Sequence, residues 1–238
     1  MKTVLITGGS RGIGAEMVRR FSDNGYRVAF VYCRSSDAAE RVARETGALA
    51  IRADIAAEED VLRAAREARV FLGKIDVLIN NAAVSEFSLF TDITSEQWNR
   101  MMAVNLNGAF YFCREILPEM IARRAGRIIN ISSMWGQVGA SCEVHYSVTK
   151  AALIGLTKAL AKEVGPSGVT VNCIAPGVIA TDMNASLDAD AIASLCDETP
   201  LGRLGTPSDV AACALFLSGE GGDFITGQVI GVNGGFVI

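Results

Sequence analysis

The stretch Val4-Leu5-Ile6-Thr7-Gly8-Gly9-Ser10-Arg11-Gly12-Ile13-Gly14 decides the fold of this chain. A short apolar run leads into glycines, and a helical pattern with Met17, Val18 and Phe21 on one side follows them. Glycine allows a tight turn and a close approach of the backbone to a pyrophosphate, while the amides at a helix start face the phosphates. Because strand, glycines and helix come in this order, we interpret the turn as a dinucleotide site rather than an ordinary loop.

The rest of the chain alternates strand-like and helix-like segments. The strand-like segments are Arg27–Tyr32, Ala48–Ala53, Ile75–Ile79, Arg127–Ser132, Thr170–Ile174 and Gln228–Val232. The helix-like segments are Ser35–Thr46, Glu58–Leu72, Ser95–Arg123, Val144–Val164 and Pro207–Leu217. This alternation predicts one doubly wound α/β domain over residues 1–238, with a parallel sheet between helices and ligands at the carboxyl ends of the strands. Pro118 lies inside a helical pattern and should kink or break it.

Composition narrows the function classes. The chain has 238 residues, a net charge of −4 and scattered basic residues, which disfavours nucleic acid or an anionic membrane as a partner. We see neither a signal peptide nor a membrane-spanning run, so we expect a cytoplasmic protein with reduced thiols. The six cysteines show no paired metal-ligand spacing, and His145 is the only histidine. A histidine-cluster metal site is therefore excluded, and a Ser-His-Asp hydrolase is disfavoured.

Tyr146 and Lys150 are four residues apart, which stacks the phenol and the ammonium on one face of a helix. A free tyrosine ionises near pH 10, and a neighbouring fixed cation lowers that pKa toward the working range. The pair alone is weak evidence, because the same spacing occurs by chance on many surface helices. Here it follows Ser133 by 13 residues and lies downstream of the glycine turn, which makes the combination informative.

Several motifs in order make the chain resemble the short-chain dehydrogenase/reductase family. They are Thr7-Gly8-x-x-x-Gly12-x-Gly14, Asn80-Asn81-Ala82-Ala83, Asn105, Ser133, Tyr146-x-x-x-Lys150 and Pro176-Gly177-x-x-x-Thr181. The segments Phe224–Gln228 and Val232–Gly235 resemble the branch that contains 3-oxoacyl-acyl-carrier-protein reductases. The resemblance implies a single Rossmann domain with a seven-stranded parallel sheet. Ala83 departs from the family pattern, which usually has glycine there.

The resemblance also implies a division of catalytic labour. Tyr146 would protonate a carbonyl oxygen as general acid, and Ser133 would hold and polarise that carbonyl. Lys150 would lower the pKa of Tyr146 and bond the nicotinamide ribose, while Asn105 would anchor a water behind Lys150. Each has a simpler alternative: Ser133 would cap a helix or turn, and Asn105 would be a polar helix residue bonded to nearby backbone.

The end of the second strand indicates the cofactor. An NAD site usually has an acidic residue there, whereas an NADP site supplies arginine for the 2′-phosphate. This chain has Tyr32-Cys33-Arg34-Ser35-Ser36, without an acid, and Arg11 offers a second guanidinium. We therefore expect NADP(H), although Arg34 would also suit a solvated loop. The residues expected to bind the cofactor are Gly8, Ser10, Arg11, Gly12, Ile13, Gly14, Arg34, Asp54, Ile55, Asn81, Ala82, Ala83, Tyr146, Lys150, Pro176, Gly177, Ile179 and Thr181.

The substrate is less determined. The segment 132–145 should border the pocket, where Trp135, Glu143 and His145 would touch substrate, pack the loop or face solvent. The basic cluster 123–127 would attract an acidic acyl carrier protein, but no second arginine occurs at 165–168, where such reductases usually carry one. The segment 133–144 also resembles reductases of a 5-aminopentanone group on elongation factor P, in which Glu143 would complement an amine. A catalytically silent nucleotide-sensing or scaffold protein would not need the intact Ser133, Tyr146 and Lys150.

Two further expectations concern assembly and motion. The segments Ser95–Arg123 and Val144–Val164 carry more apolar residues than one sheet-facing stripe requires. The residues in question include Phe110, Phe112, Leu153, Leu156 and Leu160. By family resemblance these helices and the segment Gly227–Ile238 form two two-fold contacts in a homotetramer; alternatively, the apolar residues are buried within one subunit. Residues 182–198 are interpreted as a mobile substrate lid or a static surface helix.

Overall fold

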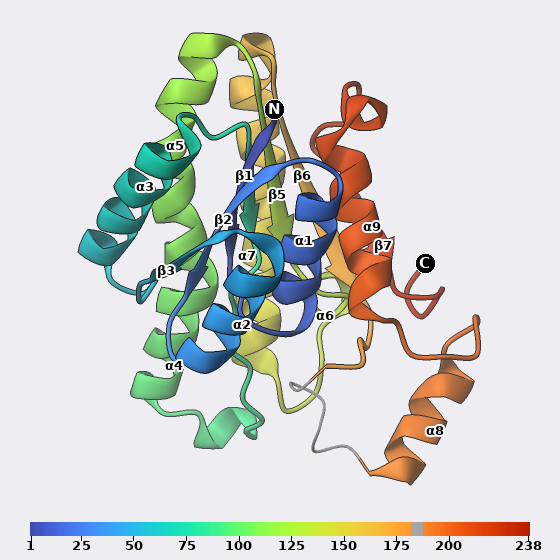
Figure 1. The fold of residues 1–238 in the computed structure, drawn as a ribbon. Coiled ribbons are helices and arrows are strands. Elements are labelled where there is room, and N and C mark those ends of the chain that lie inside the picture. Colours follow the sequence, from blue (N-terminus) through green and yellow to red (C-terminus); the bar gives the residue numbers. More distant parts are fainter. Residues whose placement is uncertain (182–187) are drawn as a thin grey trace.

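The computed structural model describes residues 1–181 and 188–238, and its centre is one sheet of seven parallel strands in the order β3-β2-β1-β4-β5-β6-β7 (Figure 1). The strands are β1 (Thr3–Thr7), β2 (Arg27–Tyr32), β3 (Leu49–Arg52), β4 (Val77–Asn80), β5 (Gly126–Ile131), β6 (Val169–Pro176) and β7 (Val229–Val232). The α-helices are α1 (Gly12–Asp23), α2 (Ser36–Thr46), α3 (Glu58–Leu72), α4 (Ser95–Met102), α5 (Gly108–Arg123), α6 (Trp135–Val138), α7 (Val144–Val164), α8 (Ala189–Glu198) and α9 (Pro207–Ser218). The predicted doubly wound fold and seven-stranded parallel sheet are confirmed.

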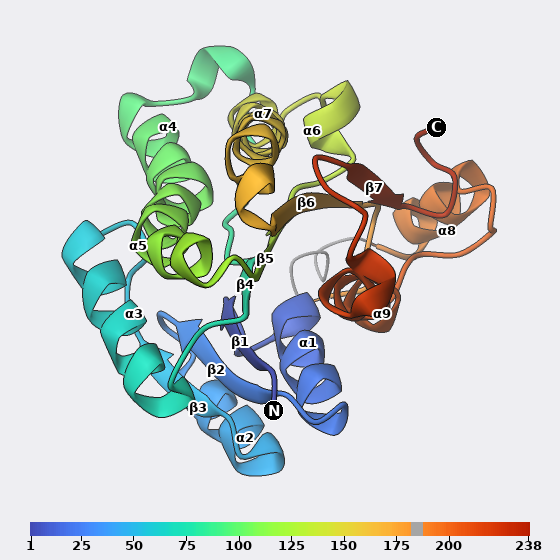
Figure 2. The ribbon, with the colours of Figure 1, turned by 90° about the horizontal axis from the view of Figure 1, so that it is seen from above.

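The sheet is covered on both faces, which Figure 2 shows from above. Every residue of β1 is buried, and its side chains alternate between two cores. Leu5 packs in the core that also takes residues from α3, α5 and α7, whereas Val4 and Ile6 pack with residues of α1, α2 and α9. Strand order reverses between β1 and β4, so a crevice for a ligand is expected outside their carboxyl ends.

The helical segment 95–123 is not broken where the sequence suggested. The α5 helix continues through Pro118 to Arg123, so of the predicted kink or break the break is wrong, and the kink stays a prediction. The buried residues Phe112 and Ile116 anchor the helix in the core, which offsets the hydrogen bond that proline removes. The irregularity lies earlier, where residues Ala103–Asn107 form a π-helical turn between α4 and α5. That turn carries Asn105, and π-turns inside helices often occur at functional sites.

Apolar residues of α5 and α7 divide into two groups. Phe112 and Leu153 are 0% and 2% exposed within this one chain, so they are core residues and no evidence for a partner. Phe110 remains 43% exposed, and Ile121 and Val148 are also exposed. The apolar surface that would meet a second subunit is therefore smaller than the sequence suggested.

The segment interpreted as a lid contains the helix α8. The α8 helix projects from the body in Figure 1, and none of its residues is buried. A helix is thus present in the second half of the segment interpreted as a lid, while residues 182–187 lie outside the described residues. Among the helices described in residues 1–181 and 188–238, none is long and apolar enough to cross a membrane.

Candidate functional site

A cavity of about 640 Å³ opens at the carboxyl ends of the central strands. Every residue predicted to bind the cofactor lines it, from Gly8 in the glycine turn to Thr181 after β6. Ser133, Tyr146 and Lys150 line the same cavity, whereas Asn105 lies outside its lining. The topology therefore brings together residues that are more than 170 positions apart in the chain, between Gly8 and Thr181.

The glycine turn is shaped by close contacts that no side chain would fit. A Cβ atom on Gly14 would lie 2.1 Å from the carbonyl oxygen of Gly8, and Gly8 itself has a φ of +71°. The Asn81 side chain secures the turn, because its Nδ2 donates to Thr7 O at 2.9 Å and to Gly8 O at 3.3 Å. The first turn of α1 holds no acidic residue, so the exposed amides at its start are suited to phosphate.

Two arginines line the same cavity as the glycine turn. Arg34 and Arg11 both line it, both are solvent-exposed, and neither guanidinium forms an ion pair within the described part of the chain. The strand β2 ends at Tyr32, and no acidic residue follows it among the cavity-lining residues 33–35. The site therefore offers cationic forks where a 2′-phosphate would bind and no carboxylate to repel it.

Three of the residues predicted to be catalytic lie together on another part of the cavity wall. The Ser133 hydroxyl lies near enough to Tyr146 to lower the pKa of the phenol, and Ser133 Oγ accepts the Trp135 backbone N–H at 3.1 Å. Lys150 Nζ lies 5.4 Å from the centre of the Tyr146 ring and donates to the carbonyl oxygen of Ile131 at 2.8 Å. One turn of α7 thus presents a phenol and an ammonium beside a serine from the end of β5, as the spacing predicted.

Burial shifts the pKa values of both Tyr146 and Lys150. Burial raises the pKa of Tyr146, the Glu143 carboxylate raises it further, and the neighbouring Ser133 hydroxyl lowers it. The Lys150 ammonium donates to the Ile131 carbonyl in this structure, and the predicted lowering of the Tyr146 pKa by Lys150 stays a prediction. Burial lowers the pKa of Lys150 itself to about 8, since a charged ammonium is poorly solvated there.

Asn105 acts on the backbone next to the cavity. Its Oδ1 accepts the N–H of Val84 and its Nδ2 donates to the Val84 carbonyl, both at 2.8 Å. The same Nδ2 donates to Thr149 Oγ1 at 3.2 Å, which ties the π-turn to the catalytic helix. Both sides of the amide are thus bonded to protein groups, and its predicted water-anchoring role stays a prediction.

The sequence missed the segment that follows β4. Ser85 and Phe87 line the cavity, although neither belongs to a motif or a periodic pattern. Ser85 Oγ donates to Glu143 Oε1 at 2.6 Å, and this carboxylate is only 8% exposed. A hydrogen bond between two segments that are distant in the sequence leaves no pattern in a single chain, so only the folded structure reveals it.

The segment 132–145 borders the cavity in part. Trp135 and Glu143 line it, whereas His145 does not and is 1% exposed, so His145 is a packed residue. The basic cluster 123–127 lies at the start of β5. Because the strands are parallel, this cluster is at the amino ends of the strands, and the cavity is at their carboxyl ends. Arg127 is paired there with Asp223, and Arg123 donates to the carbonyl oxygen of Ile75. The cluster is therefore remote from the reacting groups on this chain.

Comparison with known proteins gives the family. The family model described as Enoyl-(Acyl carrier protein) reductase matches residues 8–237. The chain belongs to the short-chain dehydrogenase/reductase family. As a family member it is 38% identical over 239 residues to the 3-oxoacyl-[acyl-carrier-protein] reductase FabG of Staphylococcus epidermidis, covering 98% of both chains. It is 39% identical over 235 residues to the acetoacetyl-CoA reductase of Shinella zoogloeoides, again covering 98% of both.

A solved structure also matches this chain. The blue fluorescent protein from a metagenomic library, in complex with NADPH, shares 35% identity at a TM-score of 0.94 and covers 100% of this chain and 98% of its own. This chain has Ala83 where the family usually has glycine, and the backbone allows it. In residues 1–181 and 188–238 the non-glycine residues with positive φ are Arg124 and Cys142, so Ala83 does not have a positive φ. Ala83 thus needs no backbone conformation reserved for glycine.

Proposed function

We propose that this protein is an NADPH-dependent oxidoreductase that reduces a ketone to a secondary alcohol, most closely of the 3-oxoacyl-acyl-carrier-protein reductase type. One observation carries the proposal: Ser133 and Tyr146 line the same cavity as the glycine turn and Arg34. Two hydroxyls that face the same cavity can bind one substrate oxygen, which is the requirement of carbonyl reduction. The curated relatives named for 3-oxoacyl and acetoacetyl substrates support this reading.

The cavity fits the cofactor from both ends. The Gly8–Gly14 approach leaves backbone amides for the pyrophosphate, and Arg34 with Arg11 suits a 2′-phosphate. Lys150 is placed to bond the ribose on the nicotinamide side, while Pro176 to Thr181 would form the wall beside the ring. When bound, NADPH supplies the hydride.

Each catalytic residue then has one task. Tyr146 donates its phenolic proton to the carbonyl oxygen, and a raised pKa keeps the phenol protonated at neutral pH for that purpose. Ser133 donates a hydrogen bond that orients and polarises the same oxygen. Lys150 stabilises the phenolate that remains, because its pKa of about 8 leaves it charged at neutral pH. Asn105 positions the Val84 backbone and the catalytic helix through Thr149.

The simplest test is NADPH oxidation with a small 3-oxo ester, followed through the nicotinamide absorbance. Wild-type protein should turn over this ester, and a matched unsaturated ester should be left unreduced. The unsaturated ester tests the enoyl reductase activity for which the matching family model is named, since an enoyl reductase would consume this ester. Failure to oxidise NADPH with any ketone would overturn the proposal and favour a nucleotide-sensing or scaffold protein.

A second candidate substrate is favoured by the buried carboxylate. Glu143 is 8% exposed, lines the catalytic cavity and has the neutral Ser85 hydroxyl as a hydrogen-bond partner. A ketone carrying a cationic amine would offset that charge, and the 5-aminopentanone group on modified elongation factor P has this chemistry. Comparing acyl carrier and elongation factor substrates, for wild type and Glu143→Gln, separates the two. If Glu143→Gln loses activity only on the amine-bearing ketone, the elongation factor substrate is supported. If wild type and Glu143→Gln reduce that ketone at equal rates, the acyl carrier substrate is supported.

A further inference from the structure

The chain beyond β7 folds into a tight turn against the catalytic end of the sheet. Asn233 builds this turn: its Nδ2 donates to Val237 O at 2.8 Å and its Oδ1 accepts the N–H of Gly235 at 3.0 Å. The backbone N–H of Phe236 donates to Asn233 O at 3.2 Å. Three hydrogen bonds thus hold Phe236 in a defined place, although only two residues follow it in the chain.

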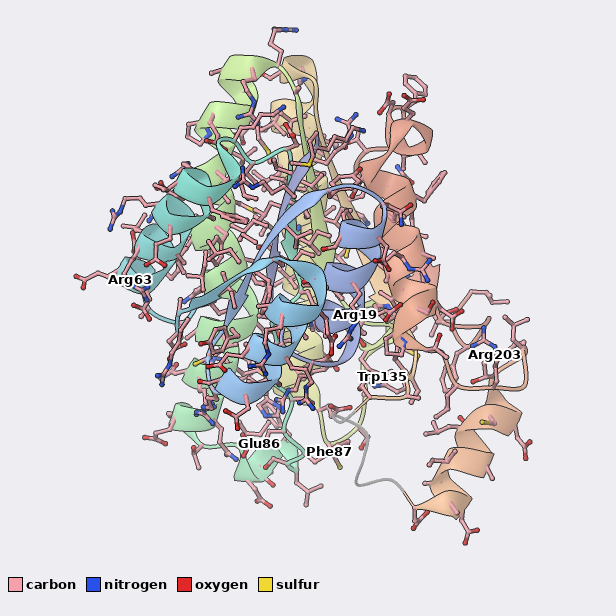
Figure 3. All side chains as sticks on the ribbon, in the orientation of Figure 1. Arg19, Arg63, Glu86, Phe87, Trp135 and Arg203 are labelled. Carbon is pink, nitrogen blue, oxygen red and sulfur yellow. The ribbon has the colours of Figure 1, made fainter. Side chains whose placement is uncertain are left out.

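Phe236 uses that place to contact a wall of the cavity. Its ring meets the Trp135 indole edge to face, with ring centres 5.9 Å apart and planes at 90°. Trp135 lines the catalytic cavity and is itself only half-buried, so its own loop does not enclose the indole. Trp135 is the first residue of α6, and its side chain is labelled in Figure 3. Edge-to-face geometry is the preferred arrangement of an aromatic pair and fixes ring orientation as well as distance.

The backbone of Trp135 is joined to the catalytic groups. Its N–H donates to Ser133 Oγ at 3.1 Å, two residues away. The next residue, Gly136, packs so closely that a Cβ there would lie 2.7 Å from both the Lys150 carbonyl carbon and Ser132 Oγ. The turn 133–136 is therefore fixed against α7, and the indole is the part of it whose orientation depends on another segment.

We infer that Phe236 is a positioning residue that holds Trp135 as the wall of the ketone subsite, so the carboxyl-terminal turn sets how well the ketone is bound. Trp135 is two residues after Ser133 and lines the same cavity, so its indole is placed beside the carbonyl that Ser133 would hold. The inference rests on the proposed ketone reduction. Losing the Phe236 ring should weaken ketone binding and leave cofactor binding intact.

Three variants test this role. Phe236→Ala removes the contact, Phe236→Tyr keeps an aromatic edge, and Phe224→Ala removes a fully exposed aromatic from the same end of the chain as a matched control. Phe236→Ala should lower kcat/KM for the ketone by roughly two- to tenfold, the range that such ring pairs are worth, mainly through KM. NADPH affinity and oligomeric mass should not change. Phe236→Tyr should restore most of the loss, and Phe224→Ala should resemble wild type.

A spectroscopic readout needs no turnover and so separates this inference from the proposed activity. The chain has two tryptophans, so in a Trp98→Phe background the emission comes from Trp135 alone. Phe236→Ala should shift that emission to the red, because the indole becomes more hydrated, and Phe236→Tyr should not. The inference is overturned if emission and KM stay unchanged in Phe236→Ala, if NADPH affinity falls as much as ketone affinity, or if the loss follows a drop in oligomeric mass.

Discussion

Replacing Lys150 by methionine should make the protein more stable while it removes catalysis. The lysine is 2% exposed, and burial lowers its pKa from 10.5 to about 8. A folded-state pKa below the unfolded value means that the folded protein disfavours the ammonium. That cost is present in full below about pH 8, decreases as the pH rises toward 10.5, and is absent above it.

The size of the effect follows from the shift. A drop from 10.5 to about 8 corresponds to roughly 3 kcal/mol, at about 1.4 kcal/mol per pKa unit. Methionine has a similar length and carries no charge, but it leaves the Ile131 carbonyl without the ammonium it accepts from, at a cost of about 1 kcal/mol. The variant should therefore exceed wild type by about 2 kcal/mol in free energy of unfolding at neutral pH.

Urea unfolding at one fixed protein concentration measures this difference across the pH range. The advantage of Lys150→Met should shrink as the pH rises between about 8 and 10.5. Lys158→Met is the matched control, because Lys158 lies on the same helix and is solvent-exposed, so its difference from wild type should be small and flat. A Lys150→Met advantage that does not vary with pH, or a loss of stability at every pH, would refute the reasoning.

Three other predictions can be checked directly. Tyr146→Phe keeps the ring but removes the acid, so turnover should fall by orders of magnitude while NADPH binding, measured by fluorescence titration, survives; near-normal turnover would contradict the assignment. Arg34→Ala should weaken NADPH far more than NADH in the same titration, because only NADPH carries the extra phosphate, and equal losses would make Arg34 a bystander. Light scattering should give a tetramer mass, since Phe110 is 43% exposed on α5, and a monodisperse monomer would exclude that assembly; Phe110→Asp should then lower the mass.

The sequence by itself determined the fold class and most of the site. The glycine turn needs glycine for reasons of backbone geometry, and alternating apolar segments leave few ways to build a sheet between helices. Tyr146 and Lys150 share a helix face through their spacing alone, and the end of β2 lacks an acid as a plain fact of composition. These features are local, so a single chain read in order is enough to find them.

Tertiary structure decided what depends on contacts between distant segments. The Ser85 bond to Glu143 and the Phe236 contact with Trp135 join residues 58 and 101 positions apart, and neither leaves a local pattern. The direction of the Tyr146 and Lys150 pKa shifts likewise depends on burial, which outweighs the effect of their spacing. Pro118 stays within α5 because its neighbours are buried, so packing overrides the local preference. Interactions across the fold have no period in the sequence, and only folding brings their partners together.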